Sequence, residues 1–223
     1  MQLNKQKFWN EKILGWENDK YLGTTGLGRA VNINRSLQVR RKIALASLAP
    51  LAKDATVVEA GCGSGLLLEA FLKLGVKKYI GIDFSSAAIS KAKERIPPDQ
   101  QHRVEFRQED IGLSKQIKCD VVFSLGLLDW LSETEVESFL STVQARYHLH
   151  SFSEQKRSIA QFLHKAYVYI LYGHNNSEYT PNYYPRETVS RFFKKSKTDS
   201  INFFSSNYLE FGCLAHNLPK INE

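Results

Sequence analysis

Short β-branched runs alternate along the chain with stretches in which apolar residues recur at helical spacing. The predicted helices include one after residue 65, where Leu67, Leu68, Phe71 and Leu72 share a face. The predicted buried strands cover residues 57–60, 79–82, 104–106, 120–124 and 147–151, with a closing pair at 201–204 and 211–216. Strands that alternate with helices at this rhythm predict a parallel sheet with helices on both faces.

The flanking segments predict further helices. One is expected over 36–49, where Pro50 ends it, and a long one over 153–171. A short helix is expected to begin at Pro185. Residues 1–35 interleave aromatic and charged side chains, and two interpretations stay open for them: a lid over a ligand, or an N-terminal helix docked on the core.

Three glycines follow the first predicted strand at every second position. Gly61, Gly63 and Gly65 allow positive φ and a close approach of a ligand to the backbone, and Glu59 precedes them. A strand, a tight turn and a helix start form the place where α/β folds bind nucleotide-like ligands. A dinucleotide-binding turn would carry its third glycine at the position of Leu66, and Glu59 would repel a pyrophosphate. The turn therefore favours a ligand that carries an amine or a positive charge.

Acidic residues also follow the next two predicted strands. Asp83 ends the second strand, 18 residues beyond Gly65, and Asp110 follows the third. In parallel sheets, ligands bind beyond the carboxyl ends of the strands, where all these polar residues are expected. We therefore predict one binding site along this edge.

Local capping signals predict where two helices begin. Ser85 is expected to cap a helix after the second strand, and Ser132 with Glu135 is expected to form a capping box at the start of a later helix.

The turn from Glu59 to Gly65 resembles motif I (acid-x-Gly-x-Gly-x-Gly) of the class I S-adenosylmethionine-dependent methyltransferases. The resemblance covers about residues 55–151 and extends more weakly to 217. It implies a Rossmann-like, doubly wound sheet of seven strands, mostly parallel with an antiparallel last strand. It also implies S-adenosyl-L-methionine as cofactor and S-adenosyl-L-homocysteine as product. A single domain over 1–223 is expected, with an N-terminal helical cap at 1–52, a cofactor-binding core at 53–151, an acceptor-side helical insertion at 152–200 and the closing strands at 201–217.

The same resemblance assigns roles to individual residues. The loop that holds Gly61, Cys62, Gly63 and Gly65, together with Glu59, is expected to receive the methionine end of the cofactor. The remaining expected cofactor contacts are Asp83 with both ribose hydroxyls, Phe84 against the adenine, Asp110 with the adenine amine, Ile111 on the ring, and Ser124 and Leu125 at the methionine moiety.

Methyl transfer from a sulfonium depends mainly on alignment and on exclusion of water. A general base is needed only if the acceptor must lose a proton. His150, at the end of the fifth predicted strand, is the candidate base, ahead of His148 and Asp129. The alternative is that His150 is buried inside the sheet, with its hydrogen bonds made within the protein. Cys62, Cys119 and the third cysteine, Cys213, lie far apart and form no metal-binding spacing, so no metal is expected.

The acceptor is predicted to be a small or medium-sized metabolite, methylated at O, N or C. Family members that methylate DNA amino groups carry Asn/Asp-Pro-Pro-aromatic after the fourth strand, whereas residues 124–127 read Ser-Leu-Gly-Leu, so nucleic acid is disfavoured. Tyr179, Tyr183 and Tyr184 are expected either to cover the acceptor or to pack added helices. Three alternatives stay open: an RNA methyltransferase, a cofactor-binding domain without turnover, and a nucleotide-dependent oxidoreductase, against which Leu66 argues.

Bulk composition changes this picture little. The chain has 223 residues, a formal net charge of +7 and three cysteines. A sparse, odd cysteine count is typical of a reducing compartment, and the N-terminus lacks the apolar core of a signal peptide. No apolar run reaches the length of a membrane span. We therefore expect a cytoplasmic protein whose basic excess need not reflect nucleic-acid binding.

Overall fold

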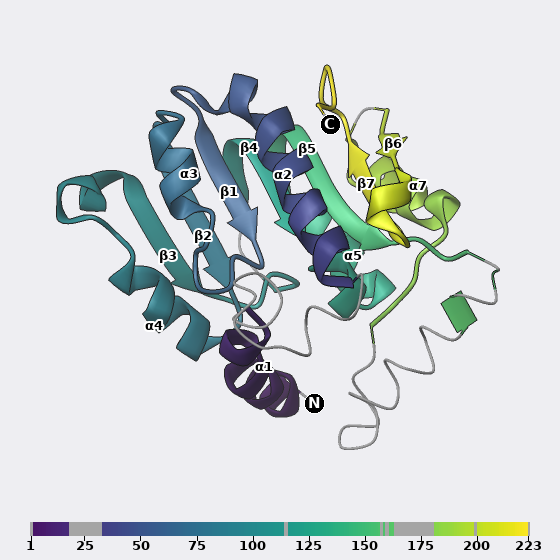
Figure 1. Ribbon diagram of the computed structural model, residues 1–223, viewed down its shortest axis with the longest axis horizontal. Coiled ribbons are helices and arrows are strands. Elements are labelled where there is room, and N and C mark those ends of the chain that lie inside the picture. The colour runs from purple at the N-terminus through teal and green to yellow at the C-terminus, as the bar shows by residue number, and fades with distance from the viewer. Residues whose placement is uncertain are drawn as a thin grey trace.

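The computed structural model describes residues 2–17, 33–113, 116–156, 158, 161–162, 181–198 and 200–222. Its centre is a seven-stranded sheet with the order β3-β2-β1-β4-β5-β7-β6, shown in Figure 1. The strands are β1 Thr56–Ala60, β2 Lys78–Asp83, β3 Val104–Gln108, β4 Ile117–Leu125, β5 Val143–Ser153, β6 Asn202–Phe204 and β7 Gly212–His216. Strands β1 to β5 are parallel, and β7 runs antiparallel to both β5 and β6. The predicted strands and the predicted fold class are confirmed.

Helices cover both faces of this sheet. They are α1 Gln2–Glu17, α2 Ile33–Ala52, α3 Leu68–Lys73, α4 Ser86–Glu94, α5 Glu133–Thr142 and α7 Arg186–Lys195, with 3₁₀ turns η3 Pro98–Arg103, η4 Leu128–Trp130 and η6 Asn207–Leu209. Side chains of α2, α3 and α4 pack with Val57 and Phe123 on one face. Side chains of α5 and α7 pack with Val58 and Val122 on the other. No described helix is long and apolar enough to cross a membrane.

Local capping fixes where two helices begin beside the carboxyl edge of the sheet. The Ser85 hydroxyl accepts a bond from the Ala88 N–H at the start of α4. Ser132 and Glu135 form a reciprocal capping box at the start of α5. Both caps were predicted from the sequence and are confirmed. They place the first turns of α4 and α5 at the ends of β2 and β4.

The predicted end of a helix at Pro50 is wrong, because α2 continues through Pro50 to Ala52. Proline has no N–H and leaves the carbonyl four residues earlier, that of Ala46, without its usual helical donor. The side-chain amide of Asn222 donates to that carbonyl at 3.1 Å. The C-terminal segment thus supplies the bond that proline removes.

The long helix predicted over 153–171 does not begin where expected. Ser153 is the last residue of β5, and Glu154 forms a parallel bridge with Tyr184. The backbone is therefore extended at the first two residues of the predicted helix. Most of that helix, and Tyr179, lie outside the described residues.

Candidate functional site

A cavity of about 150 Å³ lies beyond the carboxyl ends of β1, β2, β3 and β4. The sequence-predicted residues that line it are Glu59, Gly61, Cys62, Gly63, Asp83, Phe84, Asp110, Ile111 and Leu125. Further lining residues come from α1, α2, the η4 loop and α5, and include Lys5, Trp9, Arg41, Trp130 and Glu135. Residues from four neighbouring strands thus converge on one site, as the topology of a parallel sheet requires.

The glycine loop forms the floor of the cavity. Gly61 and Gly63 have φ of 72° and 52°, a conformation that other residues rarely adopt. A Cβ on Gly61 would lie 3.2 Å from the Leu127 side chain on the opposite wall. The Gly61 N–H donates to the Ile82 carbonyl at 2.8 Å, which attaches the loop to β2. Glycine is therefore required both for the turn and for the width of the cavity.

Asp83 ties this loop to the start of α4. Its carboxylate accepts bonds from the N–H groups of Gly63 at 2.8 Å and Ser85 at 2.9 Å. Burial raises the pKa of Asp83 above its ordinary value, and the backbone N–H donors oppose that rise. A carboxylate has acceptor capacity beyond two bonds. Asp83 can therefore hold the loop and still accept hydroxyl donors from a ligand in the cavity.

Glu59 lies at the other end of the loop with a buried partner. The Tyr79 hydroxyl donates to the Glu59 carboxylate. Burial, followed by the charge of Glu59, raises the pKa of Tyr79 well above its ordinary value, so the tyrosine remains a neutral donor. Arg41 lines the same cavity and donates to the Leu66 carbonyl at 2.7 Å. A carboxylate and a guanidinium are thus available to a zwitterionic ligand.

Gly65, Ser124 and His150 do not line the cavity, although the sequence placed them there. Gly65 has φ of 72°, and a Cβ on it would lie 2.8 Å from the Phe106 ring, so this glycine serves packing. Ser124 and His150 are fully buried and bonded to each other, Oγ to Nδ1, at 2.9 Å. The His150 ring meets Phe139 of α5 edge to face. The prediction that His150 faces the ligand is wrong.

The reason is the alternation of side chains along β5. Ser151, one residue further, points to the opposite face, where its hydroxyl accepts a bond from the N–H of Gly126, a lining residue, at 2.7 Å. His148 shares the buried side of His150. Asp129 is also buried, and its carboxylate is held by the N–H and hydroxyl of Ser153. Among the described residues, no histidine lines the cavity.

Comparison with known proteins identifies the fold and a methyltransferase domain within it. A family model described as "Methyltransferase domain" matches residues 58–150, which span β1 to β5. Within these residues the chain contains a methyltransferase domain. Two solved structures have a similar fold. One is magnesium protoporphyrin IX methyltransferase from Synechocystis with bound S-adenosylhomocysteine, with a TM-score of 0.70 and 14% identity over 97% of this chain and 98% of that chain. The other is an S-adenosylmethionine-dependent methyltransferase from Mesorhizobium loti, with a TM-score of 0.60 and 12% identity over 79% of this chain and 96% of that chain.

Curated relatives are similar to only part of this chain. Ribosomal protein L11 methyltransferase from Alkaliphilus oremlandii is 36% identical over 95 residues, which is 41% of this chain and 30% of the relative. The Clostridium botulinum protein of the same name is 35% identical over 69 residues, 31% and 22% of the two chains. The chain therefore spans less than a third of the length of these relatives.

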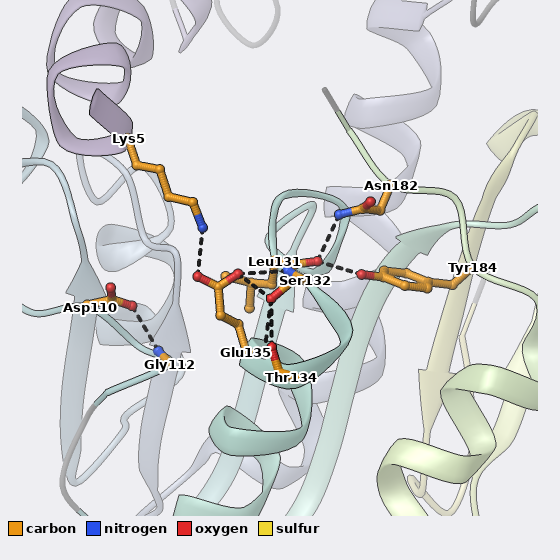
Figure 2. Close-up of polar contacts among 9 residues, drawn as sticks. All are labelled: Lys5, Asp110, Gly112, Leu131, Ser132, Thr134, Glu135, Asn182 and Tyr184. Atoms are coloured by element: carbon orange, nitrogen blue, oxygen red, sulfur yellow. Dashed lines mark hydrogen bonds and ion pairs between the residues drawn. The ribbon is translucent and has the colours of Figure 1, made fainter. Parts of the chain in front are cut away.

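The cavity has a further apolar wall that the sequence did not predict. The η4 loop supplies Leu127, Trp130 and Leu131 to the cavity. The Leu131 carbonyl accepts bonds from the Asn182 amide at 2.9 Å and from the Tyr184 hydroxyl, as Figure 2 shows. Tyr184 is buried, so it packs behind the wall. These contacts join residues more than fifty positions apart, and no local spacing signals them.

The buried histidines make the stability of the domain sensitive to acid, and we expect His148→Gln to reduce that sensitivity. Burial lowers the pKa of His148 from 6.5 to about 4. Between these values the unfolded chain binds a proton that the folded protein excludes, so stability is lost as pH falls from 6.5 toward 4. The loss for one histidine reaches about 1.4 kcal/mol per pH unit. Urea unfolding at pH 6.5 and 4.5 should show a difference roughly 1–2.5 kcal/mol smaller in the variant.

Two buried acids act in the opposite direction in both proteins and cancel in this comparison. Burial raises the pKa of Asp129 from 3.8 to about 6 and also raises the pKa of Asp83. His102→Gln, on the exposed turn η3, is the control and should leave the pH difference unchanged. Equal pH differences in wild type and both variants would contradict the explanation.

Proposed function

We propose that this chain binds S-adenosylmethionine in the cavity and transfers its methyl group to an O, N or C atom of a small or medium-sized metabolite. The observation that supports this most is the meeting of acids from three neighbouring strand ends with a glycine loop in one cavity. Carboxylates suit the hydroxyl, amine and sulfonium groups of this cofactor. They do not suit the pyrophosphate of a dinucleotide.

The side chains at one end of the cavity fit an adenosine. Asp83 offers a carboxylate to the two ribose hydroxyls, and Phe84 and Ile111 offer apolar surfaces to the adenine ring. Asp110 lines the cavity and is fixed by the Gly112 N–H, which donates to its Oδ1 at 3.0 Å. A fixed carboxylate is a suitable acceptor for the exocyclic amine.

The residues at the other end fit the amino-acid part of the cofactor. Glu59 and the backbone of the loop at Gly61 and Gly63 suit the ammonium group, and Arg41 suits the carboxylate. Leu125, at the end of β4, supplies apolar surface beside them. The bound sulfonium supplies an activated methyl group with a neutral leaving group.

The chain's own contribution to transfer is then alignment and exclusion of water. Trp130, Leu127 and Leu131 form an apolar wall next to the end of β4. An enclosed apolar wall suits a compact acceptor. The described lining offers carboxylates and no imidazole. An acceptor that must lose a proton would therefore pass that proton to a carboxylate or to water.

We expect Arg41→Gln to weaken binding of S-adenosylhomocysteine about tenfold or more, because a charge-assisted bond contributes about 1.5–3 kcal/mol. Adenosine, which lacks the carboxylate, should bind both proteins equally. Lys42→Gln, at the exposed neighbouring position of α2, is the control for the loss of charge. An equal loss of affinity for both ligands would contradict the assigned role of Arg41.

The proposed function is tested by measuring S-adenosylhomocysteine formation from S-adenosylmethionine across a panel of metabolites. Turnover with one class of metabolite and none with total RNA or purified ribosomal protein L11 is the expected result. Turnover with RNA, or cofactor binding without any turnover, would instead favour one of the alternative functions.

A further inference from the structure

Helix α1 lines the cavity with one of its faces. Figure 1 shows it beyond the arrowheads of β1 and β2, next to α4. Lys5, Trp9 and Ile13 are spaced four residues apart, so they lie on one side of the helix, and all three line the cavity. The N-terminal segment therefore forms one wall of the proposed cofactor site.

An ion pair attaches α1 to the start of α5. Lys5 Nζ lies 2.6 Å from Glu135 Oε1, and the two side chains are 20% and 27% exposed, so solvent shields the pair only partly. Figure 2 shows Lys5 reaching from α1 to Glu135. The other oxygen of Glu135 accepts the N–H and hydroxyl of Ser132 in the capping box. Burial would raise the pKa of Glu135, but the bonds from Lys5 and Ser132 outweigh it and hold that pKa below its ordinary value.

Two further contacts attach α1 to other walls of the cavity. Asn10 Oδ1 accepts the Ser85 hydroxyl at 2.8 Å, and the Ser85 N–H donates to Asp83. Trp9 meets Trp130 edge to face, with ring centroids 5.0 Å apart. Phe8 packs against both rings.

We infer that α1 is a lid over the cofactor site, with the pair between Lys5 and Glu135 as its latch. The inference rests on the proposed function, in which a cofactor enters this cavity and its product leaves. The three attachments lie on separate walls, at α5, at the end of β2 and on η4, so α1 closes the mouth only while all are made. A partly exposed ion pair and an aromatic edge contact break and re-form without unfolding the domain.

Cys62 allows opening of the lid to be measured without any cofactor. Cys62 is one of the lining residues and is 5% exposed. Cys213, in β7, is fully buried and lies outside the cavity lining, so it reports unfolding of the sheet. The full-length protein is treated with N-ethylmaleimide, and modification of each cysteine is followed by peptide mass spectrometry.

Lys5→Glu should raise the modification rate of Cys62 about three- to tenfold, because it replaces the pair by a repulsion with Glu135. Lys7→Glu is the matched control: it makes the same charge change at an exposed position on the same helix and should leave the rate unchanged. Cys213 should react at one slow rate in all three proteins. The inference is overturned if both variants leave Cys62 unchanged, if both accelerate it equally, or if Cys62 accelerates only together with Cys213.

Added S-adenosylhomocysteine separates this inference from the proposed function. Protection of Cys62 by S-adenosylhomocysteine is expected in wild type and should weaken in Lys5→Glu. If S-adenosylhomocysteine gives no protection while Lys5→Glu still accelerates modification of Cys62, the proposed cofactor is contradicted and the lid is not. If S-adenosylhomocysteine protects Cys62 in both proteins, but Cys62 reacts equally fast in both without it, the lid is contradicted and the proposed cofactor is not.

Discussion

Asp83→Ala is expected to weaken binding of S-adenosylhomocysteine about 100-fold or more, since two hydrogen bonds to a charged group contribute about 1.5–3 kcal/mol each. The change also removes the acceptor for the N–H groups of Gly63 and Ser85, so the glycine loop loses its attachment to α4. Isothermal titration of S-adenosylhomocysteine into the folded variant measures the loss directly.

Asp120→Ala is the matched control for this effect. Asp120 makes the same kind of contact, because its carboxylate accepts the N–H of Thr56 at 2.7 Å, but at the opposite end of β1. It should lower stability without changing affinity. Equal affinities for the Asp83 and Asp120 variants would show that Asp83 does not contact the ligand.

Gly65→Ala is expected to have the second large effect, on stability. A side chain at φ of 72° costs about 1–2 kcal/mol, and the new Cβ would lie 2.8 Å from the Phe106 ring, an overpacking that costs about 1–3 kcal/mol. Phe106 is buried and packs against Tyr79, so it cannot easily move. The free energy of unfolding, measured by urea denaturation, should fall by about 2–5 kcal/mol.

Gly75→Ala separates the two causes. Gly75 has φ of 76°, and a Cβ there would meet only the Lys53 side chain at 3.9 Å. It should lose about 1–2 kcal/mol, for the backbone conformation alone. Phe106→Leu should restore part of the stability in the Gly65→Ala background. Equal losses in the two alanine variants would contradict the packing role of Gly65.

The sequence predicted the parts of the fold that local signals determine. Strand runs, the glycine turn and the caps at Ser85 and Ser132 each act within a few residues, and the structure contains all of them. The resemblance to the methyltransferases added the antiparallel last strand, which no local signal in the chain specifies. Asp83 and Asp110 line the cavity as the sequence predicted, because Asp83 ends the parallel strand β2 and Asp110 lies two residues beyond the end of β3.

Side-chain direction in β5 was not predictable in the same way. Both faces of this strand are buried under helices, so the alternation of His148 and His150 with the apolar Leu149 does not show which side faces the cavity. An interpretation that placed His150 at the cavity therefore had no pattern to check it against. The structure turns Ser151, and not His150, to that side.

Contacts between distant segments explain the other features that the sequence predicted wrongly or did not predict. The helix break expected at Pro50 is cancelled by Asn222, a residue 172 positions away. Lys5 and Glu135 lie 130 positions apart, and the sequence around each indicates only a charged residue on the surface. Tertiary structure alone brings such pairs together, and they supply the walls that complete the cavity.

Isothermal titration of S-adenosylhomocysteine and, separately, of NAD into the wild-type protein tests the central claim most directly. We expect saturable heat with one S-adenosylhomocysteine per chain and no heat with NAD. Saturable heat with NAD alone, or with neither ligand, would contradict the assignment of this cavity to an S-adenosylmethionine cofactor.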